Sequence, residues 1–190
     1  MMNDPKRLSH DLERVKKFTQ MTIDQILTIV FGIPSDGFKN MEGNTQYQKA
    51  GGVDIIIIST DKGIEVKTNS FKNWNAYHDR GYVLVEIYRD RDKPEQGGAL
   101  SNSKSIHFVH QFENETGDGI QEALIYNTKE LQEYAMNAYK EGNYIKTYSH
   151  PDGIYDIKNI NEETGEIYYT RNILIHEKDI QDFLYFHWKN

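Results

Sequence analysis

The stretch from Gly51 to Lys67 constrains this chain more than any other. Its isoleucine run, Ile55 to Ile58, predicts a buried strand, and the polar residues Thr60 to Gly63 predict a turn into a second short strand. Three charged side chains interrupt this apolar hairpin, namely Asp54, Glu65 and Lys67. Because an unpaired charge in apolar surroundings is costly, charges at this spacing indicate a functional site.

The expected register of the hairpin brings the three charges to one side. A turn at residues 60–63 pairs Ile58 with Glu65, and the same register pairs Asp54 with Asn69. Side chains alternate along a strand and directly opposed residues share a face, so Asp54, Glu65 and Lys67 point the same way. A loop of odd length would turn Asp54 to the other face unless a bulge compensated.

Length and composition favour one globular domain. The chain has 190 residues, and we expect a single domain over 1–190, with a core at about 6–142 and an extension at about 143–190. It has no cysteine, which excludes disulfides and thiolate sites. No apolar run approaches eighteen residues and no secretory leader is visible, so we expect no membrane partner and a cytoplasmic protein.

The net charge of −7 argues against a protein that coats nucleic acid through many Lys and Arg contacts. It is compatible with an enzyme that uses a bound cation and a local basic patch. Residues 67–93 carry six Lys or Arg against four Asp or Glu, a net charge of +2, and the remaining chain is then −9. The positive part therefore begins at the second strand of the hairpin.

The periodicity along the chain predicts an α/β (α+β) fold with a mixed sheet flanked by helices. We expect helix over 6–31 with a break near Met21, loops over 35–50 and 69–80, and helix over 127–140. Strands are expected over 81–88, 106–112, 123–126 and 144–148. The C-terminal part is expected to form an acidic hairpin, with strands over 154–157 and 166–170, and a closing helix over 179–189.

The charged hairpin has the groups that phosphodiester hydrolysis needs. Hard oxygen ligands suit Mg²⁺ or Mn²⁺, which usually bind one or two carboxylates and keep several waters. Asp54 and Glu65 are the candidate carboxylates, and the backbone carbonyl of Val66 is a third, neutral ligand. Lys67 stands where an ammonium can orient the water or stabilise charge on the phosphorus.

This set resembles the PD-(D/E)XK nuclease superfamily, in which an Asp precedes Glu-x-Lys on an antiparallel strand pair. The run Gln48-Lys-Ala-Gly-Gly-Val-Asp54, then Ile64 to Thr68, then Val83 to Ile87, is similar to phage-type members. The resemblance spans about residues 46–112, and Gly98 departs from it where an aromatic residue is expected. It implies a restriction-endonuclease-like fold and a Mg²⁺- or Mn²⁺-dependent deoxyribonuclease, with Asp54, Glu65 and Lys67 catalytic.

The resemblance also implies supporting residues. Gln48 and Glu86 match polar positions near the site, and an acidic residue of the N-terminal helix joins the metal ligands in many members. Glu13 is our choice for that residue, with Asp24, Asp11 and Glu42 as open alternatives. For DNA contact we expect a group of basic and aromatic residues: Lys72, Trp74, Tyr77 and Arg80.

The residues predicted to be catalytic or to bind DNA also have purely structural interpretations. Glu65 and Lys67 also fit an ion pair on a solvated strand, and Trp74 and Tyr77 also fit a segment that covers the sheet. Two other functions stay open: a catalytically inactive binding module on a nuclease fold, and a phage-type inhibitor that binds a host protein through its acidic surface. RNA stays open as a substrate, and a homodimer is compatible with the sequence.

Overall fold

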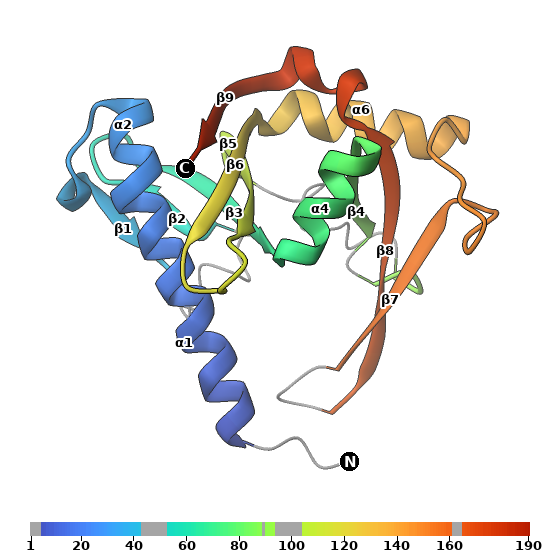
Figure 1. The fold of residues 1–190 in the computed structure, drawn as a ribbon, viewed down its shortest axis with the longest axis horizontal. Coiled ribbons are helices and arrows are strands. Elements are labelled where there is room, and N and C mark those ends of the chain that lie inside the picture. Colours follow the sequence, from blue (N-terminus) through green and yellow to red (C-terminus); the bar gives the residue numbers. More distant parts are fainter. Residues whose placement is uncertain (1–4, 43–52, 89, 94–103, 161–164) are drawn as a thin grey trace. The chain divides into compact units, whose positions relative to one another are not determined.

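The protein has a mixed α+β fold with few helices (Figure 1). A computed structural model describes residues 5–42, 53–88, 90–93, 104–160 and 165–190. The chain divides into two compact units: the first comprises Met1–Trp74, Lys104–Tyr126 and Tyr185–Asn190, and the second comprises Asn75–Ser103 and Asn127–Leu184. No helix among the described residues has the length and apolarity that crossing a bilayer requires.

A six-stranded mixed sheet forms the centre of the first unit, in the order β1-β2-β3-β5-β6-β9. Its strands are β1 (Phe38–Asn40), β2 (Ile55–Ile57), β3 (Lys62–Asn69), β5 (His107–Glu113), β6 (Ile120–Asn127) and β9 (Leu184–Lys189). The β1–β2 and β2–β3 pairs are antiparallel, whereas β3 and β5 run parallel. The expectation of a mixed sheet is confirmed.

The N-terminal helical segment begins at Pro5 and is continuous through the predicted break. It consists of α1 (Pro5–Thr22), the π-helical turn η1 (Ile23–Leu27) and α2 (Thr28–Phe31). Thr22 has helical backbone angles, and its hydroxyl bonds the Phe18 carbonyl at 2.8 Å and Gln111 Oε1 at 2.7 Å. The irregularity is thus a widened turn and not a second N-terminus. Gly32, at φ +64°, ends the segment.

The core of the first unit lies between this helical segment and one face of the sheet. Phe18, Ile23, Ile26 and Leu27 from the helical segment pack with the apolar strand residues Ile55, Ile57, Ile64 and Val109. Ile64 is fully buried on this side, and Val66 packs partly against the same cluster. Alternation along β3 therefore turns Glu65 and Lys67 to the opposite face.

The hairpin that carries the charges has a different register from the predicted one. Ile55 pairs with Ile64 and Ile57 with Lys62, so the four-residue turn spans 58–61. Asp61 occupies the left-handed region at φ +55° in this turn. The predicted turn at 60–63 is wrong by two residues on each strand. The predicted turn and the observed turn both contain four residues, so the side chains of both strands stay on the faces that were predicted.

Two segments differ from the predicted secondary structure. Residues 69–80 were expected to be a polar connection, but Phe71–Arg80 forms the helix α4. Its aromatic residues Phe71, Trp74 and Tyr77 follow one another at three-residue spacing, which is a helical stripe. Residues 179–189 were expected to be a closing helix; they contain the 3-10 turn η5 (Gln181–Phe183) and strand β9, whose run of aromatic residues favours a strand.

The remaining predicted loop and strand also need correction. Part of the expected loop at 35–50 forms the 3-10 turn η2 (Ser35–Gly37) and strand β1, and residues 43–50 lie outside the described part. Residues 144–148 do not form a strand, although the backbone N–H of Ile145 donates to the Leu174 carbonyl at 2.9 Å.

The second unit contains an antiparallel three-stranded sheet in the order β4-β8-β7. Its elements are β4 (Tyr82–Tyr88), α6 (Thr128–Glu141), β7 (Ile154–Ile160), β8 (Ile167–His176) and the 3-10 turn η4 (Glu177–Asp179). The predicted helix that ends at Gly142, the third strand and the β7–β8 hairpin are confirmed. Along β4 the buried residues are Val83, Val85 and Ile87, as alternation predicted.

Candidate active site

Asp54 lies immediately before β2 and is 7% exposed. Its backbone links two strands, because its N–H donates to the Ile64 carbonyl at 3.1 Å and its carbonyl accepts from the Met41 N–H at 2.7 Å. Its side chain turns to β3, where Oδ2 accepts a hydrogen bond from the Val66 N–H at 2.7 Å. Backbone contacts on both sides thus fix this carboxyl group beside the Glu65-Val66-Lys67 segment.

The Asp54 carboxyl is electrostatically unusual. Burial, and then the negative charge of Glu42, raise the pKa of Asp54 from 3.8 to about 8. The Val66 N–H and the positive charge of Lys67 act in the opposite direction, and they do not offset the first two effects. Asp54 and Glu42 also share a side-chain hydrogen bond. At neutral pH, therefore, the Asp54 carboxyl group holds a proton that a cation can replace.

Glu42 is the acidic neighbour that the structure supplies. It follows β1 directly, and its N–H donates to Asn40 Oδ1 at 3.0 Å. Glu13, our choice from the sequence, is an exposed residue of α1, and its role stays a prediction. Glu42 was only an alternative because no sequence pattern predicts β1, the strand that sets its position beside Asp54.

The other residues of the motif lie along β3, whose Val66 N–H contacts Asp54. In an extended strand the N–H and C=O of one residue point to the same neighbour, so the Val66 carbonyl is directed to the side on which Asp54 lies. Glu65 is half-buried and Lys67 is exposed, and both lie on the face of β3 opposite the helix-packed core. Asp54, Glu42, the Val66 backbone and the Lys67 charge therefore come together.

These groups fit a hard divalent cation in their chemistry. Glu42 and Asp54 provide two carboxyl groups, and the Val66 carbonyl provides a neutral oxygen, which is the donor set that Mg²⁺ and Mn²⁺ prefer. In the described part of the chain, no three His, Asp or Glu side chains are grouped closely enough to hold a metal ion by themselves. A cation here would keep several of its waters, as Mg²⁺ usually does.

The remaining predicted site residues are spread over both units. Gln48 lies outside the described residues, and Glu86 lies on β4 of the second unit, half-buried. The four residues expected to bind nucleic acid all belong to α4: Lys72, Trp74, Tyr77 and Arg80. Lys72 and Arg80 are exposed, whereas Tyr77 is 3% exposed, which leaves its ring almost no surface on which to stack a base.

Trp74 belongs to a cluster around the buried carboxylate of Glu122, which the sequence did not indicate. Its indole N–H donates to Glu122 Oε2 at 2.7 Å, and its ring stacks on Phe71 with centroids 5.1 Å apart. His187 Nε2 bonds the same carboxylate, and Lys189 Nζ lies 3.3 Å from Glu122 Oε1. The Trp74 N–H thus has a partner within the first unit, which favours the covering interpretation of this side chain.

The end of the basic stretch is largely neutralised inside the second unit. Arg91 lies 3.1 Å from Asp92 and 3.3 Å from Asp156, and Lys93 lies 3.5 Å from Asp90. Lys93 also approaches Glu166 at 3.6 Å. Asp90 and Asp92 are already counted in the net charge of +2 along residues 67–93, whereas Asp156 and Glu166 are not. That count therefore overstates the positive charge that Arg91 and Lys93 present to a ligand.

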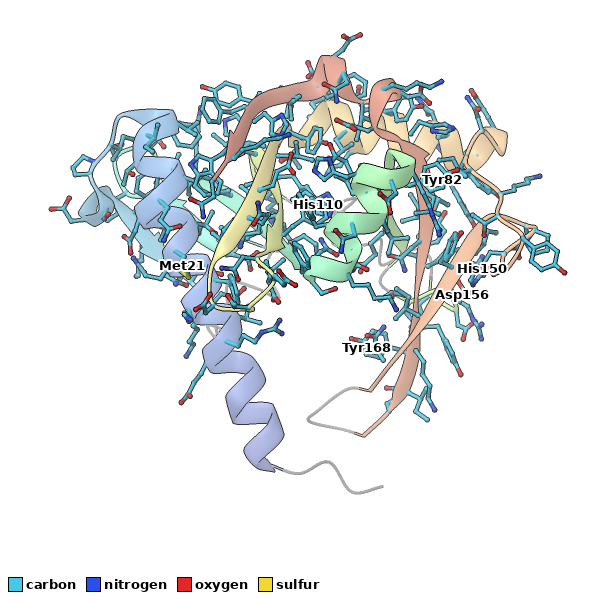
Figure 2. The ribbon with its side chains drawn as sticks, viewed as in Figure 1. Met21, Tyr82, His110, His150, Asp156 and Tyr168 are labelled. Carbon is cyan, nitrogen blue, oxygen red and sulfur yellow. The ribbon has the colours of Figure 1, made fainter. Side chains whose placement is uncertain are left out.

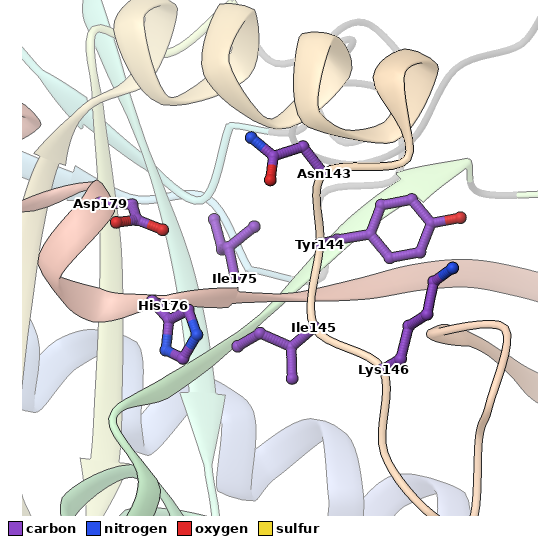
Figure 3. A pocket seen from close by; sticks show the side chains of 7 residues that line it. All are labelled: Asn143, Tyr144, Ile145, Lys146, Ile175, His176 and Asp179. Atoms are coloured by element: carbon purple, nitrogen blue, oxygen red, sulfur yellow. The ribbon is translucent and has the colours of Figure 1, made fainter.

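A separate pocket lies in the second unit, beside the end of β8 (Figure 3). Figure 3 shows His176 and Asp179 at one end of its lining and Tyr144 and Lys146 at the other. None of the residues predicted for the site lines it. Its polar groups carry both signs of charge, and they show no arrangement specific to one ligand.

Comparison with known proteins gives no identification. No protein-family model matches the sequence, and no curated protein matches it significantly. The residues and their geometry are therefore the only basis from which a function can be inferred.

Proposed function

We propose that this protein is a metal-dependent nuclease that hydrolyses phosphodiester bonds of DNA, with a restriction-endonuclease-like fold in its first unit. The observation that carries the proposal is the Asp54 site: a buried carboxyl group shares a hydrogen bond with Glu42 and contacts the backbone between Glu65 and Lys67. The antiparallel β2–β3 pair that holds these residues is the arrangement in the family that the motif resembles.

Each residue of the site has a distinct role in this proposal. Glu42 and Asp54 hold Mg²⁺ or Mn²⁺ together with the Val66 carbonyl, and Glu65 completes the acidic set. The bound cation would polarise the phosphate and lower the pKa of a coordinated water. Lys67 orients the attacking water or stabilises the charge that develops on the phosphate oxygens. Lys72 and Arg80, both exposed, contact the DNA backbone.

Cleavage assays on wild type and matched variants test this proposal. Purified protein is incubated with linear, circular, single-stranded and branched DNA and with RNA, in Mn²⁺ and then in EDTA. We expect cleavage that EDTA abolishes, with a loss of at least about a hundredfold in Asp54→Asn and Glu65→Gln. Glu133→Gln is the control, because Glu133 is an exposed residue of α6.

The possible outcomes separate the candidate functions. Unchanged cleavage in Asp54→Asn would reject this site. Calorimetry with Mn²⁺ distinguishes the inactive binding module, which predicts no binding at Asp54 and Glu42. Absence of cleavage of any substrate, together with a stable complex with a host protein, would favour the inhibitor. Gel filtration with light scattering tests the homodimer that two-strand cutting would require, and fractionation tests the cytoplasmic location.

A further inference from the structure

A buried histidine shares the sheet face of Lys67. The parallel register of β3 and β5 places Lys67 opposite His110 and Val66 opposite Val109. Val109 belongs to the core beneath the helical segment, so alternation turns Lys67 and His110 to the other face. His110 is 5% exposed, and Figure 2 labels its ring. The nearest side-chain neighbour across the strands from the candidate catalytic lysine is thus an imidazole.

His110 has an unused hydrogen-bonding atom. Nothing in the described part of the chain bonds its Nδ1, although this atom is buried. The Phe112 ring lies against the imidazole with centroids 4.7 Å apart. Burial, and then the positive charge of Lys67, lower the pKa of His110 to about 4. The ring is therefore neutral at neutral pH, and one of its nitrogens is a hydrogen-bond acceptor.

An ammonium group is a partner of the right kind. Adjacent strands are about 5 Å apart, so a lysine side chain is long enough to lean over the residue opposite it. Lys67 is exposed, and a free lysine side chain samples many rotamers. A hydrogen bond to a fixed ring would use one of its three N–H donors and leave two for water and phosphate.

We propose that His110 is a positioning residue for Lys67, whose ammonium donates a hydrogen bond to the unpartnered ring nitrogen. This inference rests on the proposed nuclease function. His110 does not touch the substrate; it limits the orientations of Lys67 so that the ammonium stays beside Asp54, whose pKa already responds to the Lys67 charge. The Lys67 ammonium then orients the attacking water without first having to sample other rotamers.

Three variants separate this role from simple packing. His110→Phe keeps an aromatic ring and removes the nitrogen, whereas His110→Asn places an amide oxygen near the position of Nδ1. His107→Phe is the matched control, because His107 lies on the same strand with an Nδ1 that also has no partner among the described residues. The register pairs His107 with Ile64, which places it on the opposite face of the sheet.

The first measurement does not depend on cleavage. Reductive methylation of Lys67 is compared with that of exposed Lys72 in the same molecule, by peptide mass spectrometry, with and without Mn²⁺ and a short DNA duplex. We expect His110→Phe to raise the Lys67 methylation rate at least about threefold, because a side chain that is not held by the ring nitrogen is more accessible to the reagent. His110→Asn and His107→Phe should match wild type. Equal Lys67 rates in wild type and His110→Phe would overturn the proposal.

The second measurement is the division between kcat and KM. We expect His110→Phe to lower kcat by about tenfold at unchanged KM and unchanged Mn²⁺ midpoint, with kcat restored in His110→Asn. If kcat falls as much in His110→Asn as in His110→Phe, the effect is one of packing, and the positioning role of His110 is rejected. If the His110→Phe protein does not fold, as judged by thermal unfolding, His110→Leu is used in its place. If wild type cleaves nothing, the nuclease proposal fails, and methylation still decides the Lys67–His110 contact.

Discussion

Two aspartates of this protein have opposite electrostatic surroundings. Asp54, in the first unit, is buried beside another carboxyl group, and its pKa is raised to about 8. Asp156, in the second unit, accepts hydrogen bonds from Arg171 at 3.0 Å and from Arg91 at 3.3 Å, which lower its pKa (Figure 2). Asp156 thus has cations supplied by the chain itself, whereas Asp54 and Glu42 lack enough neighbouring positive charge. This difference is the reason that we propose Asp54, and not Asp156, as part of a ligand site.

Glu42 supplies the second carboxyl group beside Asp54, and its removal tests the contrast with Asp156 most directly. We expect Glu42→Gln to lower Mn²⁺ affinity and cleavage by about a hundredfold, because one of two charged ligands is lost. Glu13→Gln, on the exposed side of α1, should leave both near wild type. Isothermal titration with Mn²⁺ and the cleavage assay measure the effects. If Glu13→Gln lowered both quantities and Glu42→Gln did not, Glu13 would be the additional acidic ligand of the metal.

Removal of the Asp54 charge should stabilise the metal-free protein at high pH. Since folding raises this pKa from 3.8 to about 8, the folded state binds more protons than the unfolded state in that interval. The resulting stability is present below about pH 4 and lost as the pH rises to about 8. We expect Asp54→Asn to gain about 2 kcal/mol at pH 9 in EDTA, or roughly 4–8 °C in Tm.

The same variant should match wild type below the low end of that interval, where Asp54 is protonated in both states. Thermal unfolding at a series of pH values measures the difference. Asp24→Asn is the control, because Asp24 is an exposed residue of η1. A destabilised Asp54→Asn at pH 9 would contradict the raised pKa.

Metal affinity should depend on pH through the same carboxyl group. A cation displaces the proton held by Asp54, so binding releases about one proton below the pKa of about 8. We expect Mn²⁺ affinity to increase by about tenfold per pH unit from pH 6 towards 8 and then to level off. Calorimetry in buffers of different ionisation enthalpy counts the released protons. Affinity that is independent of pH would place the cation elsewhere.

The smallest effect should come from the aspartate that already has its cations. A lowered pKa gives stability that is present above 3.8 and lost as the pH falls through the folded-state value. Because Asp156 lies at the surface, we expect Asp156→Asn to lose less than about 1 kcal/mol at pH 7. Urea unfolding should show this loss shrinking in 1 M salt and vanishing in acid. A higher free energy of unfolding for Asp156→Asn at pH 7 would contradict the contrast between Asp156 and Asp54.

The sequence predicts the parts of this fold that local pattern determines. The alternation of Val83, Val85 and Ile87 defines β4, and the stop at Gly142 defines the end of α6, because periodicity and glycine conformation are local properties. The face of Lys67 follows from alternation alone, so it survives the error in the turn. Residues 184–189 were predicted as helix because their apolar residues also fit a helical period.

The part of the candidate site that could not be predicted depends on contacts between distant residues. Glu42 reaches Asp54 only because a three-residue strand, β1, pairs with β2, and so short a strand has no clear pattern. His110 is a neighbour of Lys67 only through the parallel β3–β5 register, which a sequence of two separate strands does not specify. The motif of Asp54, Glu65 and Lys67 could be recognised in the sequence, whereas its spatial neighbours Glu42 and His110 could not be predicted from it.

The position of β9 has a consequence for synthesis of the chain. Residues 185–190 belong to the first unit, and His187 and Lys189 bond Glu122 there, yet all of the second unit precedes them. During translation the sheet that carries Asp54 and Lys67 therefore stays one strand short after residues 75–184 have emerged. A nascent chain released before residue 184 would leave the Glu122 carboxylate without two of its donors, so loss of residues 185–190 would affect the unit with the candidate site.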